Sequence, residues 1–155
     1  MIPFETKGGR FLPWTDRREV VNFSFFNHDF FCKEHMSKIL IHIHSGPDLK
    51  NKATLGMLVA VSAIKDGHDV SLFLAADGVH LLKCSETGKV VGEGTGDLKE
   101  HLDFLQSANT TLWVSGMSAK ARGYDENLLE GFNAEFAMPN RLVEASLEAD
   151  TVLCY

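Results

Sequence analysis

The feature that most constrains the fold is a regular alternation of strand and helix patterns that begins directly after Met36. Residues 38–45 (KILIHIHS) form a β-branched apolar run, which is typical of a buried strand. Residues 50–67 form a long, mostly apolar helical pattern that Gly67 closes. Further strand patterns cover 68–78, 110–116, 131–137 and 150–155; helical patterns cover 79–83, 97–109, a short stretch after 116, and 138–149. The glycine-rich residues 84–96 are expected to form a mobile loop.

Strands separated by helices predict right-handed crossovers, and therefore a parallel sheet covered on both faces. We predict an α/β fold: a three-layer sandwich with a mostly parallel sheet of about five strands, in a flavodoxin-like architecture. The chain has 155 residues, which suits one domain with one core. We place this domain at residues 36–155.

Residues 1–35 differ in composition from the rest of the chain. They hold seven of its 11 phenylalanines, without a helical or strand period: Phe4, Phe11, Phe23, Phe25, Phe26, Phe30 and Phe31. Two interpretations stay open. In the first, Met36 is the true initiator, and residues 1–35 are a mis-assigned start or a disordered extension. In the second, these residues are an aromatic arm that packs on a partner subunit.

Charge and cysteine content argue against several classes of protein. The net charge of −6 makes a nucleic-acid partner unexpected. No apolar run is long enough to span a bilayer, and no secretory signal is recognisable. Cys32, Cys84 and Cys154 are odd in number and widely spaced, which fits neither a disulfide framework nor a zinc ribbon. Reduced thiols in a cytoplasmic protein are expected, with Cys154 in the core.

Three segments follow predicted strands at the edge where parallel sheets usually bind ligands: His44–Asp48, Ala75–Gly78 and Ser115–Gly123. In the third segment a helix is expected to begin near Ser118, so that its free N–H groups favour a small anion. The alternative is that Ser118 only caps the helix, Arg122 pairs with a surface carboxylate and Gly123 ends the turn. The candidate ligand-binding residues are His44, Ser45, Gly46, Asp77, Gly78, Ser115, Gly116, Ser118, Lys120 and Arg122.

Two other groups could carry chemistry. His42 and His44 point to the same face of their strand, but a metal site would need a third ligand such as Asp77 or His80. We expect instead a satisfied core histidine at position 42, His44 at the strand end, and neither metal nor cofactor. Cys84 could reach the same cleft as a reactive thiol, and the alternative is a partly buried, inert one.

Taken together, four stretches resemble the DsrE/DsrF-like family over residues 36–155: residues 38–82, GMSAKARG (116–123), LLEGFNAEFA (128–137) and EADTVLCY (148–155). The resemblance implies a parallel-sheet α/β fold, a cytoplasmic location and oligomers, often trimers or hexamers. Well-understood members relay sulfur as a persulfide on a cysteine in the loop after the third strand. That position falls at Ser115 or Ser118, and a serine hydroxyl cannot hold a persulfide.

We therefore expect a non-catalytic member that binds a small anionic or sulfur-containing ligand, or a sulfur-relay partner, in the cleft of a homo-oligomer. One alternative is an active sulfurtransferase that carries the persulfide on Cys84. The other is an interaction subunit whose partner supplies the cysteine.

Overall fold

The computed structural model describes residues 36–83 and 90–155. Their centre is a parallel sheet of five strands in the order β6-β5-β2-β1-β7. These strands are β1 (Lys38–Ile43), β2 (Asp69–Leu74), β5 (Thr111–Ser115), β6 (Ala134–Ala137) and β7 (Thr151–Cys154). The predicted parallel sheet of about five strands is confirmed.

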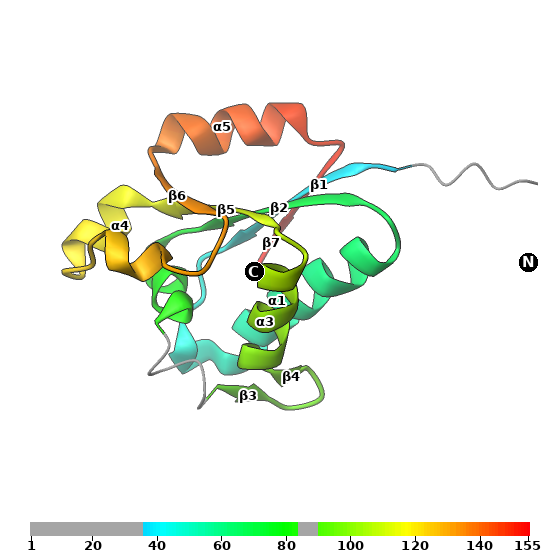
Figure 1. Cartoon of the computed structure of the whole chain (residues 1–155), viewed down its shortest axis with the longest axis horizontal. Helices are drawn as coiled ribbons and strands as arrows, with labels where there is room; N and C mark the ends of the chain where they lie inside the picture. Colours follow the sequence, from blue (N-terminus) through cyan, green and yellow to red (C-terminus); the bar gives the residue numbers. More distant parts are fainter. Residues whose placement is uncertain (1–35, 84–89) are drawn as a thin grey trace, which may run out of the picture. The chain divides into compact units, whose positions relative to one another are not determined.

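Helices cover both faces of the sheet and complete the predicted three-layer α/β fold (Figure 1). The crossovers from β1 to β2 and from β2 to β5 run in one direction along the sheet, and the crossover from β6 to β7 runs back. Because crossovers are right-handed, the returning helix lies on the opposite face. The helices are α1 (Lys50–Lys65), α3 (Leu98–Ser107), α4 (Gly116–Ala121) and α5 (Pro139–Glu148), with 3-10 helices η1 (Pro47–Leu49), η2 (Ala76–Leu82) and η3 (Glu126–Leu129).

The main core lies between the sheet and the layer of α1 and α3. Ile41, Leu72 and Leu112 are register partners on adjacent strands, and all three are fully buried. Met57 of α1 and Leu105 of α3 belong to the same buried cluster. Burial of each such side chain contributes about 1.5–3 kcal/mol, so this layer holds the strand ends, and the segments that follow them, in fixed places.

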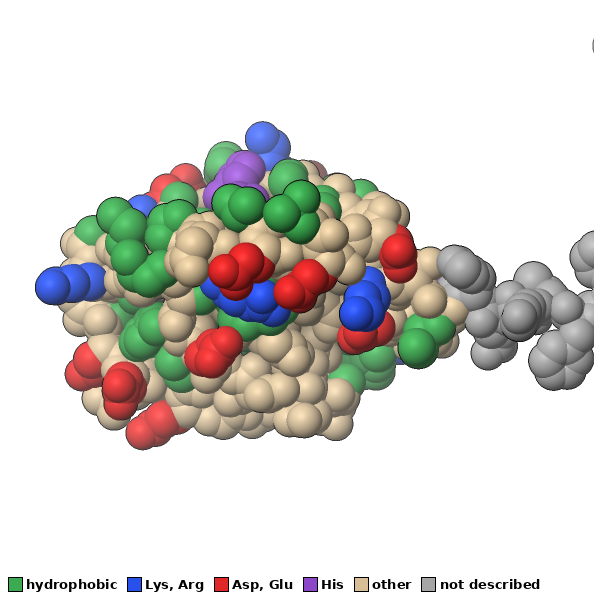
Figure 2. Space-filling model, turned by 90° about the horizontal axis from the view of Figure 1, so that it is seen from above, with side chains coloured by type: hydrophobic (Ala, Val, Ile, Leu, Met, Phe, Trp, Pro, Cys, Tyr) green, Lys and Arg blue, Asp and Glu red, His purple; other side chains and the backbone are tan. Residues whose placement is uncertain are grey.

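The opposite face carries a smaller cluster under α5. Phe73 and Trp113 pack there with Ala145. The Arg141 guanidinium lies 4.2 Å from the centre of the Trp113 ring and also pairs with Glu148. Figure 2 views the molecule from the α5 side and shows exposed hydrophobic side chains among charged ones.

The segment between η2 and α3 differs from the prediction. Val91–Gly92 (β3) and Gly96–Asp97 (β4) form a short antiparallel hairpin, so the predicted loop is wrong for these residues. The hairpin is fixed on α1 because the Thr54 and Thr95 hydroxyls lie 2.5 Å apart and Asn51 accepts a hydrogen bond from a hairpin N–H. Residues 84–89 lie outside the described part.

Cys154 lies in the last strand as expected, but it is exposed and not in the core. The physical reason is that, among the described residues, β7 is an edge strand whose one partner is β1. Across the described ranges, none of the helices has the length and apolar character that crossing a membrane requires.

Candidate functional site

The segments after β1 and β2 meet through close backbone packing at the carboxyl edge of the sheet. A Cβ placed on Gly46 would lie 2.8 Å from the Asp77 Cβ. A Cβ on Gly78 would overlap with the carbonyl oxygen of Ile43, the last residue of β1. The glycines are therefore required by the close approach of the two segments, and they bring Asp77 beside the end of β1.

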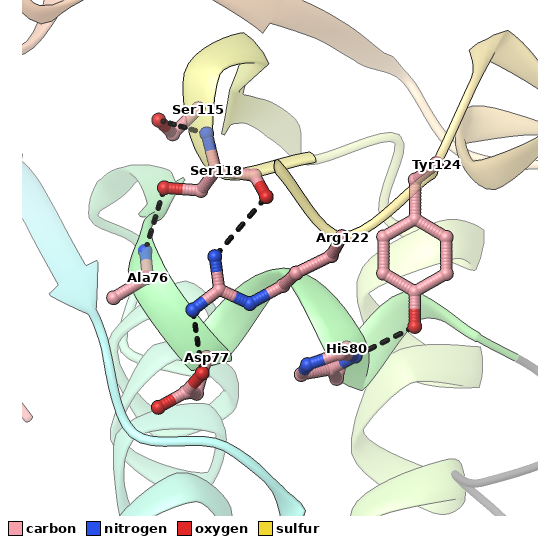
Figure 3. Close-up of polar contacts among 7 residues, drawn as sticks. All are labelled: Ala76, Asp77, His80, Ser115, Ser118, Arg122 and Tyr124. Carbon is pink, nitrogen blue, oxygen red and sulfur yellow. Dashed lines mark hydrogen bonds and ion pairs between the residues drawn. The ribbon is translucent and has the colours of Figure 1, made fainter. Parts of the chain in front are cut away.

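The third segment begins with α4, whose first turn differs from the expectation. The helix starts at Gly116 rather than near Ser118, and Ser115 is its N-cap. The Ser115 hydroxyl accepts a hydrogen bond from the Ser118 N–H at 3.3 Å. The Ser118 hydroxyl instead accepts from the Ala76 N–H at 3.0 Å and so ties α4 to η2 (Figure 3). The helix α4 thus has six residues, and the Ser115 hydroxyl already accepts a hydrogen bond from one N–H group of its first turn.

The cationic group of the site is Arg122. Its Nη2 donates to Asp77 Oδ1 at 2.6 Å, and its Nη1 donates to the carbonyl oxygen of Ser118 at 3.1 Å (Figure 3). The Arg122 side chain is 25% exposed and that of Asp77 is 57% exposed. The hydrogen bond from Arg122 is the main cause that lowers the pKa of Asp77. The alternative in which Arg122 pairs with a surface carboxylate is confirmed, and Asp77 is that carboxylate.

Two further residues join the site: His80, which the sequence analysis offered only as a possible third metal ligand, and Tyr124, which it did not single out. His80 Nδ1 lies 2.6 Å from Tyr124 Oη, and the two rings meet edge to face. His80 also lines a groove together with Pro47, Asp48 and Asp77. One signal was available: η2 places His80 one helical turn after Asp77, and Tyr124 follows Arg122 by two residues.

The remaining predicted residues occupy varied environments. His44 and Lys120 are exposed, and Gly116 is the first residue of α4. Ser45 is only 2% exposed, and its hydroxyl has no hydrogen-bond partner among the described residues. Cys84, the candidate nucleophile, lies outside the described residues.

His42 is not the satisfied core histidine that we expected. Its Nε2 is buried and has no hydrogen-bond partner within residues 36–83 and 90–155. Burial lowers the pKa of His42, and the nearby His44 lowers it further. The two imidazole centres lie 5.6 Å apart, so both histidines do share one face. The described residues include no group of three side chains arranged to hold a metal ion.

Neither Ser115 nor Ser118 is hydrogen-bonded to a histidine or carboxylate in the described part, so neither has the adjacent base that activates a serine. Figure 3 shows the Arg122 guanidinium against the Asp77 carboxylate, and His80 on the same 3-10 helix as Asp77.

Comparisons with known proteins agree with this fold. The model of the DsrE/DsrF-like family matches residues 37–155. An uncharacterised protein of Methanocaldococcus jannaschii is 27% identical over 122 residues, which cover 76% of this chain and 99% of the archaeal one. An uncharacterised protein of Methanopyrus kandleri is 27% identical over 126 residues, covering 79% and 97%. The crystal structure of the YchN protein of E. coli superimposes with a TM-score of 0.65 at 24% identity, over 77% of this chain and 100% of YchN.

Proposed function

Since the chain belongs to the DsrE/DsrF-like family, we propose that it is a non-catalytic member that binds a small, sulfur-containing anion between the segments after β1, β2 and β5. The observation that carries this proposal is the Arg122 guanidinium, which is mostly buried and held in place by the Ser118 carbonyl oxygen. A guanidinium fixed in this way offers parallel N–H donors to an anion with little loss of side-chain freedom.

Asp77 supports the position of the ligand. Its carboxylate accepts a hydrogen bond from Arg122 Nη2, and the Asp77 side chain is more than half exposed. Exposed ion pairs contribute little net stability, so an incoming anion can replace this carboxylate. Lys120 adds an exposed positive charge on α4.

The two serines are the reason to propose that the protein carries out no covalent sulfur chemistry. In members that relay sulfur, the resemblance places the carrier cysteine at position 115 or 118, and both positions are serine here. Each hydroxyl has a structural hydrogen bond: Ser115 caps α4, and Ser118 ties α4 to η2. The site therefore keeps its architecture without a carrier thiol.

The setting of this activity is also part of the proposal. We propose a homo-oligomer, a trimer or hexamer, in the cytoplasm, with a sulfur-relay protein as the partner that delivers or receives the ligand. Native mass spectrometry of the full chain measures the subunit number, and a monomer at micromolar concentration would contradict this part.

Calorimetric titration with thiosulfate tests the binding site. Wild-type protein should bind, and Arg122→Gln should lose at least about tenfold in affinity, because one charge-assisted donor pair is removed. Arg141→Gln is the matched control, since it removes the same charge from α5 on the opposite face, and it should bind as wild type does. Equal binding by Arg122→Gln and wild type would contradict the proposal.

Intact mass after incubation with a persulfide donor tests the absence of transferase activity. We expect no reducible gain of one sulfur atom. A gain that disappears in Cys84→Ser would instead assign the protein as a sulfurtransferase with its persulfide on Cys84.

A further inference from the structure

The groove beside Arg122 contains a second polar group whose orientation is fixed. His80 lies on η2 and Tyr124 lies just after α4, so their contact joins the same two segments that the Arg122–Asp77 pair joins. The Tyr124 hydroxyl is 2.6 Å from His80 Nδ1, and the ring centroids are 5.4 Å apart at an interplanar angle of 78°. This combination of a short hydrogen bond and an edge-to-face contact allows the imidazole ring one orientation.

The tautomer of His80 depends on which partner donates in the contact with Tyr124. A phenol hydroxyl that donates to Nδ1 leaves the proton of a neutral imidazole on Nε2. Nε2 is then a hydrogen-bond donor. Figure 3 shows this second nitrogen on the side of the ring that faces away from Tyr124 and toward Asp77.

The groove brings His80 next to Asp77, the residue that pairs with Arg122. His80 and Asp77 line the same groove, and Asp48 contributes its third polar side chain.

We propose that His80 is a ligand-binding residue of this site: its Nε2–H donates to the anion that Arg122 holds, and Tyr124 is a positioning residue that fixes the ring. This inference rests on the proposed function and deepens it. Two donors on separate segments select an anion with at least two acceptor atoms. The ligand class is thus a polyatomic sulfur anion such as thiosulfate, and monatomic anions such as chloride are disfavoured.

The first test is titration with thiosulfate, using chloride as the competing anion. His80→Phe keeps an aromatic ring against Tyr124 but removes the donor, and its affinity should fall about tenfold. His80→Gln is the matched control, because its amide N–H can take the place of Nε2–H, and it should stay within about threefold of wild type. Chloride should compete poorly with thiosulfate in the wild-type protein.

The second test separates positioning from a merely structural role. The ¹⁵N signals of the His80 ring in wild-type protein should show the proton on Nε2, and Tyr124→Phe should shift them toward the mixture of tautomers found in free imidazole. Tyr124→Phe should weaken thiosulfate binding in the wild-type background and have no further effect in the His80→Phe background.

The outcomes distinguish the two proposals. If Arg122→Gln loses binding but His80→Phe binds as tightly as wild type, the role of His80 is overturned and the proposed function stands. If wild-type protein does not bind thiosulfate, the proposed function itself is overturned.

Discussion

Arg122 and Asp77 form an ion pair of 2.6 Å that joins the segment after β5 to the 3-10 helix after β2. The two residues lie 45 positions apart in the chain, and the sheet brings them together because β2 and β5 are neighbouring parallel strands. Under the proposed function the pair both stabilises the site and occupies it, since the anion would take the place of the carboxylate. Removing the Arg122 charge should therefore weaken anion binding, whereas removing the Asp77 charge should strengthen it.

Asp77→Asn should raise the affinity for thiosulfate by about threefold, because the internal competitor loses its charge while the side chain keeps its shape. The matched control is Asp48→Asn, which removes a carboxylate of the same groove. It should change the affinity less, since Asp77 is the carboxylate that contacts Arg122. Calorimetric titration measures both; an Asp77→Asn variant that binds no more tightly than wild type would show that Asp77 does not compete.

Ser118→Cys should restore a sulfur carrier. The residue is half-buried and its side chain contacts the Ala76 N–H of η2, so a thiolate there can take a sulfane sulfur from a persulfide donor while the donor thiol leaves reduced. Ser115→Cys is the control and should not load, because position 115 is only 8% exposed. Intact mass, measured with and without reductant, shows whether each variant gains a sulfur atom. Equal loading of the two variants would contradict the assignment of the carrier position.

Cys154 should react with a thiol reagent in the folded protein, because it lies exposed on the edge strand β7. Cys154→Ser should lower the number of thiols that react under native conditions by one. The same assay in denaturant gives the control, since the variant must then also show one thiol fewer. An unchanged native count would place Cys154 in a protected environment.

The stability of the fold should decrease as the pH falls through about 6.5, the ordinary pKa of histidine. Burial lowers the pKa of His42 in the folded state, so the unfolded chain takes up the proton first. The unfolding free energy should therefore be lower at pH 5.5 than at pH 8, and His42→Gln should reduce this difference. His44→Gln should keep most of it, because burial is the larger cause of the shift. Urea unfolding at the two pH values is the measurement.

Gly78→Ala should reduce the unfolding free energy by about 2 kcal/mol, because the added methyl group overlaps with the Ile43 carbonyl oxygen. Gly116→Ala is the control. Its Cβ would meet nothing closer than 3.6 Å, so the free energy should stay within about 0.5 kcal/mol of wild type. Chemical denaturation of both variants checks the difference, and similar losses would show that the close approach of η2 to β1 is not required.

The alternation of apolar runs was sufficient to predict the sheet, because parallel strands buried on both faces need continuous apolar sequence. The β3–β4 hairpin was missed because its glycines indicate a loop, whereas Gly92 in fact allows the close approach of Thr54. Cys154 was misplaced for a related reason: the apolar pattern of β7 does not show that the strand lies at an edge.

The site was predictable in part. The rule that ligands bind at the carboxyl ends of parallel strands selected the three segments that meet. It could not show that Ser115, rather than Ser118, caps α4, because helix boundaries are uncertain by one or two residues. The short spacings from Asp77 to His80 and from Arg122 to Tyr124 were the one available signal, but the contact itself depends on how η2 packs against the segment after α4.

The central claim is that the three convergent segments form the ligand site, and a titration of ¹⁵N-labelled wild-type protein with thiosulfate tests it most directly. The account predicts saturable shifts of the backbone amide signals of Ala76 and Ser118 and of the side-chain signals of Arg122, with the α5 amides unchanged. Shifts confined to other elements, or none at millimolar thiosulfate, would contradict it.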